Sequence, residues 1–345
     1  MATEATAPAG IAVARVTAWL ADHVGLEPPL EFDRCIGGHS NLTYAINDRT
    51  GRRVVLRRPP MGHLLPTAHD MSREWRIIYA LGPTPVPVPP ALGFCDDPDV
   101  TGAPFYVMGY VTGHVMHDAG VARKVYGEAE RRRAGESFID VLAALHDVVP
   151  DEVGLGELGR KEGYVARQLK RWYSQWEQSK TRELPLVDQM HDFLAARIPE
   201  QGPARVVHGD YRLGNCISAD DGTILAVLDW EICTLGDPLA DVGYVLATWA
   251  ERGDPGAEGV GPSGLPGFPT RSEVLERYAA ASGRDLSLID FYVAFSHWKS
   301  ACIVEGVYAR YLQGALDPGG LDLDAYKLRV DHAVGLAAEA ADRLG

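Results

Sequence analysis

The sequence predicts an α+β protein with two lobes, a small lobe built on an antiparallel β-sheet and a large lobe that is mainly helical. Two observations favour this fold class. Segments with the composition of β-strands gather in the first 110 residues, whereas helical periodicity dominates after Gly113. We therefore expect a first lobe over residues 1–110 and a second lobe, with an inserted β-hairpin, over residues 111–345.

Length and composition fit this arrangement. The chain has 345 residues, of which 46% are hydrophobic and 23% charged, the ordinary balance of a globular protein with a sizeable core. Its formal net charge of −14 argues against a general nucleic-acid binder, which needs a basic face. The five cysteines are widely spaced and form no C-x-x-C motif, so neither a disulfide framework nor a structural zinc site is expected.

The sequence shows no signal for export or membrane insertion. The N-terminal stretch lacks the basic region and the apolar run of a signal peptide. No stretch of about 18 apolar residues occurs, as a membrane-spanning helix would require. We expect a cytoplasmic protein that binds neither nucleic acid nor membrane, and homodimer formation is left open.

The small lobe is predicted to combine helices with antiparallel strands. Val13, Val16, Leu20 and Val24 recur at helical spacing, which predicts a helix over residues 11–24. Alternating apolar residues and turn signals then predict three antiparallel strands, at 31–36, 42–46 and 53–57, and a short helix at 72–81. An extended proline-rich connector is expected at 83–90, followed by two further strands at 91–95 and 104–110.

The large lobe is predicted to consist mostly of helices. A long helix over residues 119–148 presents its apolar side chains, among them Phe138, Leu142 and Leu145, on one face. Further helices are expected at 163–180, 186–198, 239–249, 271–281, 286–312 and 324–344. The apolar segments 206–207 and 223–228 predict the inserted hairpin, and the Gly/Pro-rich stretch 253–269 predicts a mobile loop.

Two segments of the large lobe contain the residue types that phosphoryl transfer requires. They are Val-Val-His-Gly-Asp-Tyr-Arg-Leu-Gly-Asn over 206–215 and Leu-Asp-Trp-Glu over 228–231. The reaction needs a carboxylate that orients and deprotonates the attacking hydroxyl, and oxygen ligands that hold Mg²⁺ against the phosphates. Asp210 suits the first role, and Asn215 and Asp229 offer the hard oxygens that Mg²⁺ prefers. Asp210 and Asn215 have the spacing of the catalytic loop of protein kinases.

Each segment also has an ordinary structural explanation. An Asp in a glycine-bearing turn is usually a turn residue, and an Asp that ends a strand is often a helix N-cap. His208 is better explained as a hydrogen-bonded part of the loop than as the base. Both segments together, in this order and at this spacing, favour a kinase-type site.

The combination His-Gly-Asp-x-x-x-x-Asn and Leu-Asp-Trp-Glu resembles the aminoglycoside phosphotransferase/choline kinase family, whose fold is protein-kinase-like. The resemblance extends over nearly the whole chain. Val-Leu-Arg-Arg-Pro-Pro, His-Gly-Asp-Tyr-Arg-Leu-Gly-Asn and Gly-Val-Tyr-Ala-Arg are similar to segments of the kinase-like domains fused to acyl-CoA dehydrogenases and of their free-standing bacterial relatives. The resemblance implies a phosphotransferase that uses ATP and Mg²⁺ and acts on a small-molecule hydroxyl, but it says little about the acceptor.

The resemblance also implies where ATP binds. Arg57 stands where the family places a lysine on the α- and β-phosphates, and Glu74 matches the helix glutamate that pairs with it. Arginine supplies the charge but is not interchangeable with lysine. Because side chains alternate along a strand, we expect Arg57 to point into the cleft and Arg58 to face outward or toward the prolines that follow. Two solvated charges are the alternative.

Two further segments are implied to contact the nucleotide. Gly38, Ser40 and Asn41 lie in a Gly-Gly-His-Ser-Asn turn that would approach the phosphates, although it lacks the kinase G-x-G-x-x-G pattern; a bare hairpin turn is the alternative. Met108 and Tyr110 fall in a segment that resembles the hinge beside the adenine, for which an ordinary edge strand is the alternative.

Several positions near the catalytic motif are less specific. Arg212 is implied to be catalytic, facing the transferred phosphate; the alternative is a side chain that points to solvent or anchors an acidic partner. Asp237 is explained by N-capping, since Pro238 suits the first position of a helix. Asp241 is implied to brace the catalytic loop, as its family counterpart does.

Two motifs are interpreted as structural. Residues 154–159 fit G-x-G-x-x-G but follow no convincing strand, so a loop is expected rather than a dinucleotide-binding fingerprint. The run Arg131–Arg133 lies among glutamates within a helix, where a solvated face is expected.

The leading hypothesis is therefore a small-molecule kinase. The runner-up is a catalytically silent homologue that binds a nucleotide or a metabolite, which the missing lysine favours. A secreted or membrane-bound hydrolase is disfavoured because no G-x-S-x-G motif occurs.

The acceptor is expected to be a lipid-related or other metabolic hydroxyl, such as a hydroxyacyl-CoA, rather than an antibiotic. A basic and apolar cleft would suit it, and two helices offer the side chains: Arg167, Lys170, Arg171, Trp172, Trp176, Trp298, Lys299, Glu305 and Tyr308. A cationic aminoglycoside would instead want several acids, which the net charge and Glu231 permit.

Overall fold

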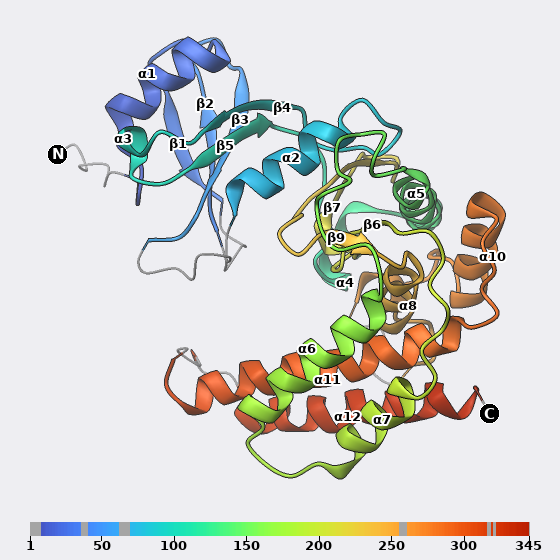
Figure 1. Ribbon diagram of the computed structural model, residues 1–345. Helices are drawn as coiled ribbons and strands as arrows, with labels where there is room; N and C mark the ends of the chain where they lie inside the picture. The colour runs from blue at the N-terminus through green and yellow to red at the C-terminus, as the bar shows by residue number, and fades with distance from the viewer. Residues whose placement is uncertain are drawn as a thin grey trace.

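A computed structural model describes residues 8–35, 41–61, 70–254, 261–315, 319 and 322–344 (Figure 1). The α+β class is confirmed, with a small lobe around an antiparallel sheet and a large lobe that is mostly helical. We propose to keep the division between residues 110 and 111, because the last strand of the small sheet ends at Gly109. Among the described helices, none combines the length and the apolar character needed to cross a membrane.

The sheet of the small lobe has five antiparallel strands in the order β1-β2-β3-β5-β4. The strands are β1 (Glu31–Arg34), β2 (Leu42–Asn47), β3 (Arg53–Arg58), β4 (Ala91–Cys95) and β5 (Phe105–Gly109), with the short helix α3 (Pro98–Thr101) between the last two. The three strands predicted to be antiparallel to one another are adjacent, as expected.

The two faces of this sheet pack against different helices. Val54 and Leu56 of β3 share an apolar core with α1 (Val13–Val24), whereas Val55 belongs to a second core with α2 (Met71–Leu81). Side chains alternate along a strand, which explains this division. The second core continues into the large lobe, so the face of β3 that carries Val55 is turned toward that lobe.

The large lobe is built from helices around α11, which packs against α6, α7, α8 and α12. Its helices are α4 (Ala119–Val125), α5 (Glu128–Asp147), α6 (Tyr164–Ser179), α7 (Pro185–Ala195), α8 (Leu239–Thr248), α10 (Arg271–Ser282), α11 (Ile289–Leu312) and α12 (Leu323–Asp342).

The expected long helix over residues 119–148 is wrong, because α4 and α5 are separate helices. Tyr126 between them adopts an extended backbone, with φ −123° and ψ 140°. Its hydroxyl donates to the carbonyl oxygen of Ala219 at 2.6 Å and lies 2.8 Å from Ser218 Oγ. The solvated face expected for Arg131 is also wrong: this guanidinium is buried and donates to the carbonyl oxygens of Tyr126 and Pro266.

The two predicted strands of the hairpin do not pair with each other. β6 (Arg205–Val207) pairs with β9 (Thr234–Gly236), and β8 (Ile224–Val227) pairs with β7 (Cys216–Ser218). β7 and β9 have three residues each, too few to show a period in the sequence. Two 3-10 turns complete the described elements, η1 (Leu213–Asn215) and η2 (Pro262–Gly264).

Candidate active site

The catalytic loop, residues 208–215, leaves the end of β6 and is held in place by the first turn of α8. Asp241 of α8 accepts hydrogen bonds from the backbone N–H groups of His208, at 2.7 Å, and Gly209, at 2.8 Å. Burial opposes ionisation of this carboxyl, but His146, His208 and the Gly209 N–H outweigh burial and lower the pKa of Asp241. Gly209 has φ 85°, in the left-handed region that glycine adopts without strain. The expected bracing role of Asp241 thus has a structural basis.

His208 is a structural member of the loop. It is fully buried, its Nε2 donates to the carbonyl oxygen of Leu228 at 2.9 Å, and its Nδ1 accepts from the N–H of Asp210 at 3.3 Å. Both ring nitrogens are thus already used in hydrogen bonds within the protein. His208 therefore joins the loop to the end of β8.

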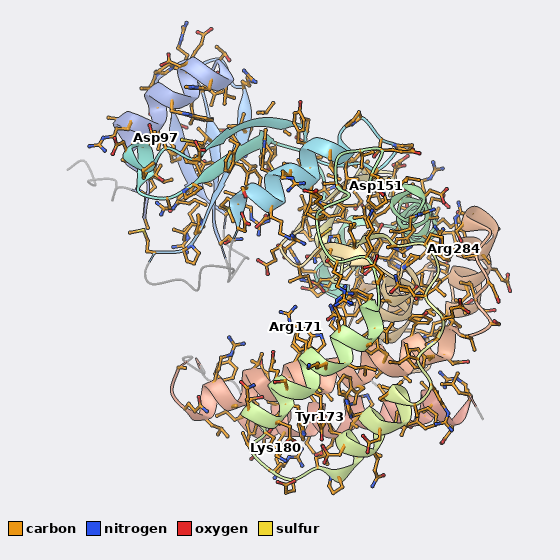
Figure 2. All side chains as sticks on the ribbon, viewed as in Figure 1. Asp97, Asp151, Arg171, Tyr173, Lys180 and Arg284 are labelled. Atoms are coloured by element: carbon orange, nitrogen blue, oxygen red, sulfur yellow. The ribbon has the colours of Figure 1, made fainter. Side chains whose placement is uncertain are left out.

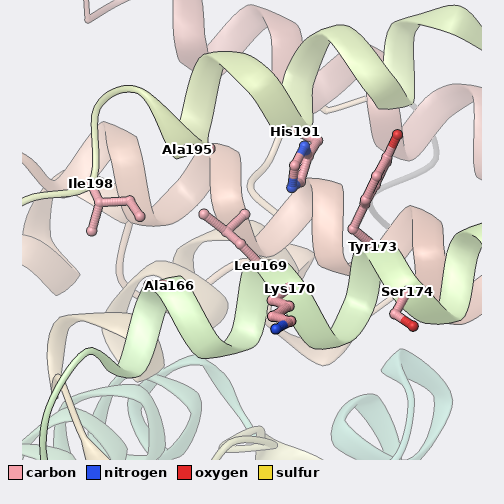
Figure 3. A pocket seen from close by; sticks show the side chains of 8 residues that line it. All are labelled: Ala166, Leu169, Lys170, Tyr173, Ser174, His191, Ala195 and Ile198. Carbon is pink, nitrogen blue, oxygen red and sulfur yellow. The ribbon is translucent and has the colours of Figure 1, made fainter.

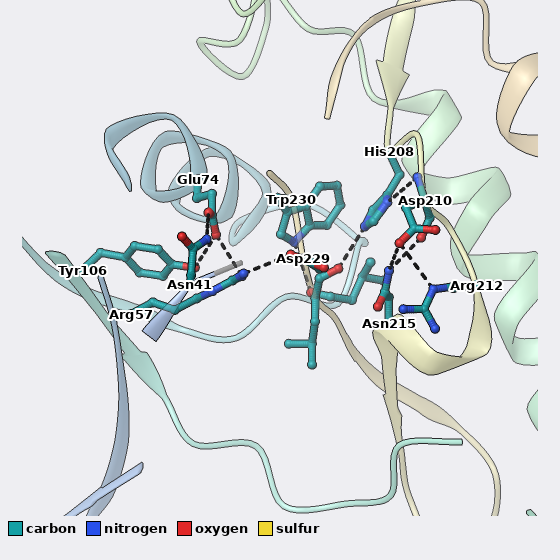
Figure 4. A network of polar contacts seen from close by, with 12 residues as sticks. Asn41, Arg57, Glu74, Tyr106, His208, Asp210, Arg212, Asn215, Asp229 and Trp230 are labelled. Carbon is teal, nitrogen blue, oxygen red and sulfur yellow. Dashed lines mark hydrogen bonds and ion pairs between the residues drawn. The ribbon is translucent and has the colours of Figure 1, made fainter. Parts of the chain in front are cut away.

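The Asp210 carboxylate is held by three donors, of which Figure 4 shows Asn215 and Arg212, and it remains accessible to solvent. Its Oδ1 accepts from the Tyr244 hydroxyl at 2.5 Å, and its Oδ2 accepts from Asn215 Nδ2 at 2.8 Å and from Arg212 Nε at 3.3 Å. The side chain is 28% exposed, so an acceptor hydroxyl can reach it. Burial raises the pKa of Tyr244, with Asp210 adding to the effect, so the phenol stays a donor.

Asn215 and Asp229 present oxygen atoms that suit a hard cation. The N–H of Leu228 donates to the carbonyl oxygen of Asn215 at 2.8 Å, which brings the residue before Asp229 against the loop. The amide nitrogen of Asn215 donates to Asp210, whereas its Oδ1 accepts no hydrogen bond from the described residues. An amide oxygen and a carboxylate are ligands that Mg²⁺ takes, with water and phosphate oxygens completing its shell. The residues present fit Mg²⁺.

Across from the loop, the ion pair expected between Arg57 and Glu74 is present. Arg57 Nη1 lies 2.9 Å from Glu74 Oε2, and Arg57 Nη2 lies 3.0 Å from Asp229 Oδ1. The Tyr106 hydroxyl of β5 donates to Glu74 Oε2 at 2.9 Å, and Asn41 Nδ2 donates to Glu74 Oε1 at 3.1 Å. Figure 4 shows this group on one side of Asp229 and the catalytic loop on the other.

The charges in this group support one another. Burial raises the pKa of Glu74, and the Arg57 guanidinium opposes that rise. Burial alone would lower the pKa of Arg57, but Tyr106, Glu74 and Asp229 raise it above its usual value. Arg57 is therefore a permanent cation beside Asp229. It lies near the end of β3, on the face of the strand that is turned toward the large lobe.

Arg58 lies on the opposite side of β3, as alternation requires. Of the two orientations expected for it, outward or toward the following prolines, the outward one is wrong. Arg58 is buried, with only 4% of its surface exposed. The guanidinium donates to the carbonyl oxygen of Pro59 at 3.2 Å, consistent with a position toward the following prolines, and to that of Gly10. It fastens the N-terminal segment to the sheet.

The other residues predicted to bind the nucleotide differ in their surroundings. Gly38 and Ser40 lie outside the described residues. Asn41 is buried, and its amide is directed to Glu74. Met108 is 9% exposed within the second core, and the ring of Tyr110 is covered by the Arg53 guanidinium, 3.7 Å from the ring centroid.

The residues expected to line an acceptor cleft fall into different environments. Lys299 of α11 and Trp172 of α6 come together, with 5.7 Å between the ammonium and the ring centroid. Trp176, Trp298 and Glu305 are fully buried, so their expected place in a cleft wall is wrong. Their helices present these side chains to the core, which the helical pattern alone did not separate from the exposed face.

Two of the cavities among the described residues lie in the large lobe. One of about 430 Å³ lies between α6 and α7, lined by Lys170, Tyr173 and His191, and includes no residue of the catalytic loop (Figure 3). A smaller one of about 160 Å³ borders the loop at Arg212 and reaches His117. Of these two cavities, only the second borders the catalytic loop.

Sequence reasoning missed Tyr106 and Tyr244. Tyr244 follows Asp241 by three residues, so the two share one face of α8, and that spacing next to a loop-bracing Asp could have indicated it. Tyr106 pairs with Arg57 in the register of β3 and β5, which no local pattern reveals.

Comparison with known proteins places these features in a family context. Residues 32–292 match the profile of the family described as "Phosphotransferase enzyme family". Acyl-CoA dehydrogenase family member 10 of Mus musculus is 37% identical over 83% of this chain and 27% of its own length. The probable acyl-CoA dehydrogenase IBR3 of Arabidopsis thaliana is 34% identical over 82% of this chain and 36% of its own length. The chain thus spans about a third or less of these relatives.

Solved structures give the same picture of the fold. A candidate aminoglycoside phosphotransferase from Ralstonia eutropha JMP134 superposes with a TM-score of 0.83, at 31% identity, over 96% of this chain and 98% of its own. An aminoglycoside phosphotransferase solved with GDP and kanamycin superposes with a TM-score of 0.62, at 14% identity, over 95% of this chain and 98% of its own. The protein-kinase-like fold expected from the sequence is confirmed.

Proposed function

The chain belongs to the phosphotransferase enzyme family, and we propose that it transfers the γ-phosphoryl group of ATP, with Mg²⁺, to a hydroxyl group of a small molecule. One observation carries the proposal. Asp210, Asn215 and Asp229 are joined through the catalytic loop and Leu228, and Arg57 approaches the same Asp229 from the other lobe. Phosphoryl transfer is mostly positioning and charge stabilisation, and this network holds the charges that it needs.

Asp210 is proposed to orient the acceptor hydroxyl and take its proton. The carboxylate oxygens are already oriented by Tyr244 and Asn215, so little reorganisation precedes the reaction. Arg212 is proposed to face the transferred phosphate from the exposed side of Asp210. Asn215 and Asp229 would hold Mg²⁺, which neutralises phosphate charge when bound.

The small lobe is proposed to bind the nucleotide. Arg57, oriented by Glu74, would contact the phosphates in place of a lysine. Asn41 would contribute from the turn after β1, together with Gly38 and Ser40. Met108 and Tyr110, at the end of β5 and just beyond it, are proposed to border the adenine. The proposed nucleotide site is completed by these two residues together with Gly38, Ser40 and Asn41.

The acceptor is proposed to be a metabolic hydroxyl compound, and a hydroxyacyl-CoA is one candidate. The names of the curated relatives support this chemical class, although the chain covers only 27% to 36% of those two proteins. We propose a cytoplasmic enzyme without nucleic-acid or membrane partners.

The alternative is a catalytically silent homologue that binds a nucleotide or a metabolite, and the arginine at position 57 favours it. A screen of hydroxyl compounds for acceptor-dependent ADP release, with Asp210→Asn as the control, separates the two. Release that needs both an acceptor and Mg²⁺, and that is lost in the control, supports the kinase. Mg²⁺-dependent ATP binding without turnover on any acceptor supports the silent homologue.

A further inference from the structure

A buried lysine lies beside the catalytic loop, and no carboxylate of the described residues pairs with it. Lys299 of α11 is 9% exposed, and its Nζ lies 3.4 Å from the carbonyl oxygen of Gly209, the residue before Asp210. Within the described part of the chain, no carboxylate comes within 4.0 Å of this ammonium. Burying an ammonium with a single long hydrogen bond is unfavourable, and such a group in a core calls for an explanation.

Aromatic rings flank the ammonium. The ring centroids of Trp172 on α6 and Tyr244 on α8 each lie 5.7 Å from Lys299 Nζ. Rings at this distance attract a cation through their faces but supply no hydrogen-bond acceptor. The ammonium therefore keeps donors to offer to a ligand, and Tyr244 connects it to the reacting position, because its hydroxyl donates to Asp210.

The other charges around this lysine are also defined. Asp241 and Asp210 lie close enough to favour its charged form, and Arg171 disfavours it; burial is the largest influence and lowers the pKa of Lys299. Figure 2 shows Arg171 on the side of α6 that faces the small lobe. Arg212 approaches Asp210 from the loop itself. Lys299 and Arg212 thus lie beside the loop at Gly209 and Asp210, and Arg171 adds a third positive charge near Lys299.

We propose that Lys299, between Trp172 and Tyr244, determines acceptor specificity by binding an anionic oxygen of the acceptor close to its reacting hydroxyl. This inference rests on the proposed function and narrows it to a substrate class: free hydroxylated acids, with a carboxylate a few bonds from the hydroxyl. It selects against a hydroxyacyl-CoA, because the thioester has no carboxylate at that place. A polycationic acceptor would place an amine against Lys299, Arg171 and Arg212, and like charges in a partly desolvated site repel strongly. The acceptor side is therefore built for acids rather than for aminoglycosides.

The test measures binding and transfer separately. The probes are the positional isomers of hydroxybutanoate, their carboxamides as neutral matches, and the aminobutanols as cationic matches. Calorimetric titration in the presence of ADP and Mg²⁺ gives affinity, and ADP release with ATP gives kcat and KM. The variants are Lys299→Met, which keeps length and packing without charge, and Lys299→Arg, which keeps the charge. Lys327→Met, at an exposed position of α12, is the matched control for loss of a positive charge.

The wild-type protein is expected to bind at least one hydroxybutanoate more tightly than its carboxamide. Lys299→Met should weaken that affinity, and raise the corresponding KM, by about 10-fold or more, as loss of a charge-assisted hydrogen bond implies. Affinity for the carboxamides should change little. Lys299→Arg should recover much of the loss, and Lys327→Met should behave as wild type. Thermal unfolding of each variant verifies the fold.

The outcomes separate this inference from the proposed function. Selective binding of the acid that depends on Lys299, without phosphoryl transfer, supports the inference and overturns the proposed reaction. Transfer that is as good with neutral or cationic probes, or unchanged in Lys299→Met, supports the reaction and overturns the inference. Equal affinity of the wild-type protein for acid and carboxamide also overturns it, because the lysine then serves only to balance Asp210 and Asp241.

Discussion

At Asp229 the backbone and the side chain are both unusual. Its φ of 64° is the only positive φ of a non-glycine residue in the described ranges, and Asp tolerates this region better than most residues. The conformation is held from both sides, since Leu228 donates to the backbone of Asn215 and the Trp230 indole donates to Val227 at 3.1 Å. Strain of this kind, about 1–3 kcal/mol, persists where surrounding structure fixes the residue, and often marks a functional site.

Replacing Asp210 tests the proposed base. Asp210→Asn should lower acceptor-dependent ADP release by about 10²- to 10⁴-fold, because the amide cannot take the hydroxyl proton. ATP affinity should stay within about twofold, since this side chain faces the acceptor rather than the nucleotide. Steady-state kinetics and calorimetric titration of ATP measure the two effects. Asp220→Asn, at a side chain that is 99% exposed, is the control. Full turnover by Asp210→Asn would remove Asp210 from the mechanism.

Replacing Asp229 and Asn215, the proposed metal ligands, tests the proposed Mg²⁺ site. Asp229→Asn should weaken Mg²⁺-dependent ATP binding strongly, because it removes a formal charge while keeping a residue type that accepts positive φ. Asn215→Ala should weaken it less, because an amide brings no formal charge to the metal. Titration of ATP with Mg²⁺ and with EDTA measures the metal-dependent part of the affinity. If both variants keep the wild-type difference, Mg²⁺ binds elsewhere.

At the scale of elements, β3 and α2 determine which cation reaches the site. Alternation along β3 places Arg57 with Val55 on the side of α2, and Arg58 with Val54 and Leu56 on the side of α1. This register was predictable from the sequence, because a one-residue shift would bury the wrong face. Glu74 then meets Arg57 across the gap between strand and helix.

Arg57 variants test this register. Arg57→Ala should lower both ATP affinity and turnover, and it should destabilise the fold by about 3 kcal/mol, because Glu74 is left buried without its partner. Arg57→Lys should retain much of the activity, since one cation remains near the phosphates. The double variant Arg57→Ala with Glu74→Gln should recover stability but not ATP affinity. Chemical denaturation and calorimetric titration separate the two effects.

Arg58→Ala is the matched contrast. It should lower stability, because buried hydrogen bonds to Gly10 and Pro59 are lost, and it should leave ATP affinity close to that of the wild type. A loss of ATP affinity in Arg58→Ala, with none in Arg57→Ala, would assign the phosphate contact to the other side of β3.

The sequence predicted elements well where a period was long enough to read. The helices after α5 and the five strands of the small sheet were located within a few residues, and the catalytic motif lies where a strand leads into a turn. The break at Tyr126 was missed although Gly127, the N-cap of α5, follows it directly and is a signal that the sequence carries. The hydrogen bond between Tyr126 and Ser218, far along the chain, has no such local signal. Contacts between distant segments, such as Tyr106 with Glu74, have no local signal.

The whole molecule is joined across its two lobes by α2. Arg73 donates to the carbonyl oxygens of Leu158, at 2.6 Å, and Cys233, at 2.7 Å, and Arg76 donates to that of Gly154 at 3.3 Å. The glycine-rich residues 154–159 form turns, as expected of a loop. Their carbonyl oxygens at Gly154 and Leu158 accept these hydrogen bonds from α2. These bonds position Glu74 relative to Asp229, so the proposed nucleotide site depends on the arrangement of both lobes.

The stability of this two-lobed fold should decrease in mild acid through His297 of α11, the helix around which the large lobe packs. Burial lowers the pKa of His297 to about 4, and the nearby cations Arg271 and Arg343 add to the effect. The folded protein thus holds this ring neutral, whereas the unfolded chain protonates it near the ordinary histidine pKa of 6.5. The stabilising contribution is present above pH 6.5 and is lost as the pH falls from about 6.5 toward 4, because the unfolded state binds the additional proton.

Chemical denaturation between pH 7 and pH 4 measures this contribution as a slope of up to about 1.4 kcal/mol per pH unit, the effect of one proton. His297→Gln removes the titrating group, so the difference in unfolding free energy between wild type and variant should shrink as the pH falls through that window. Other titrating groups, such as the buried His146, act in both proteins and cancel in the comparison. A difference that stays constant with pH would mean that His297 is protonated to the same extent in the folded and unfolded states, and that α11 does not shield it.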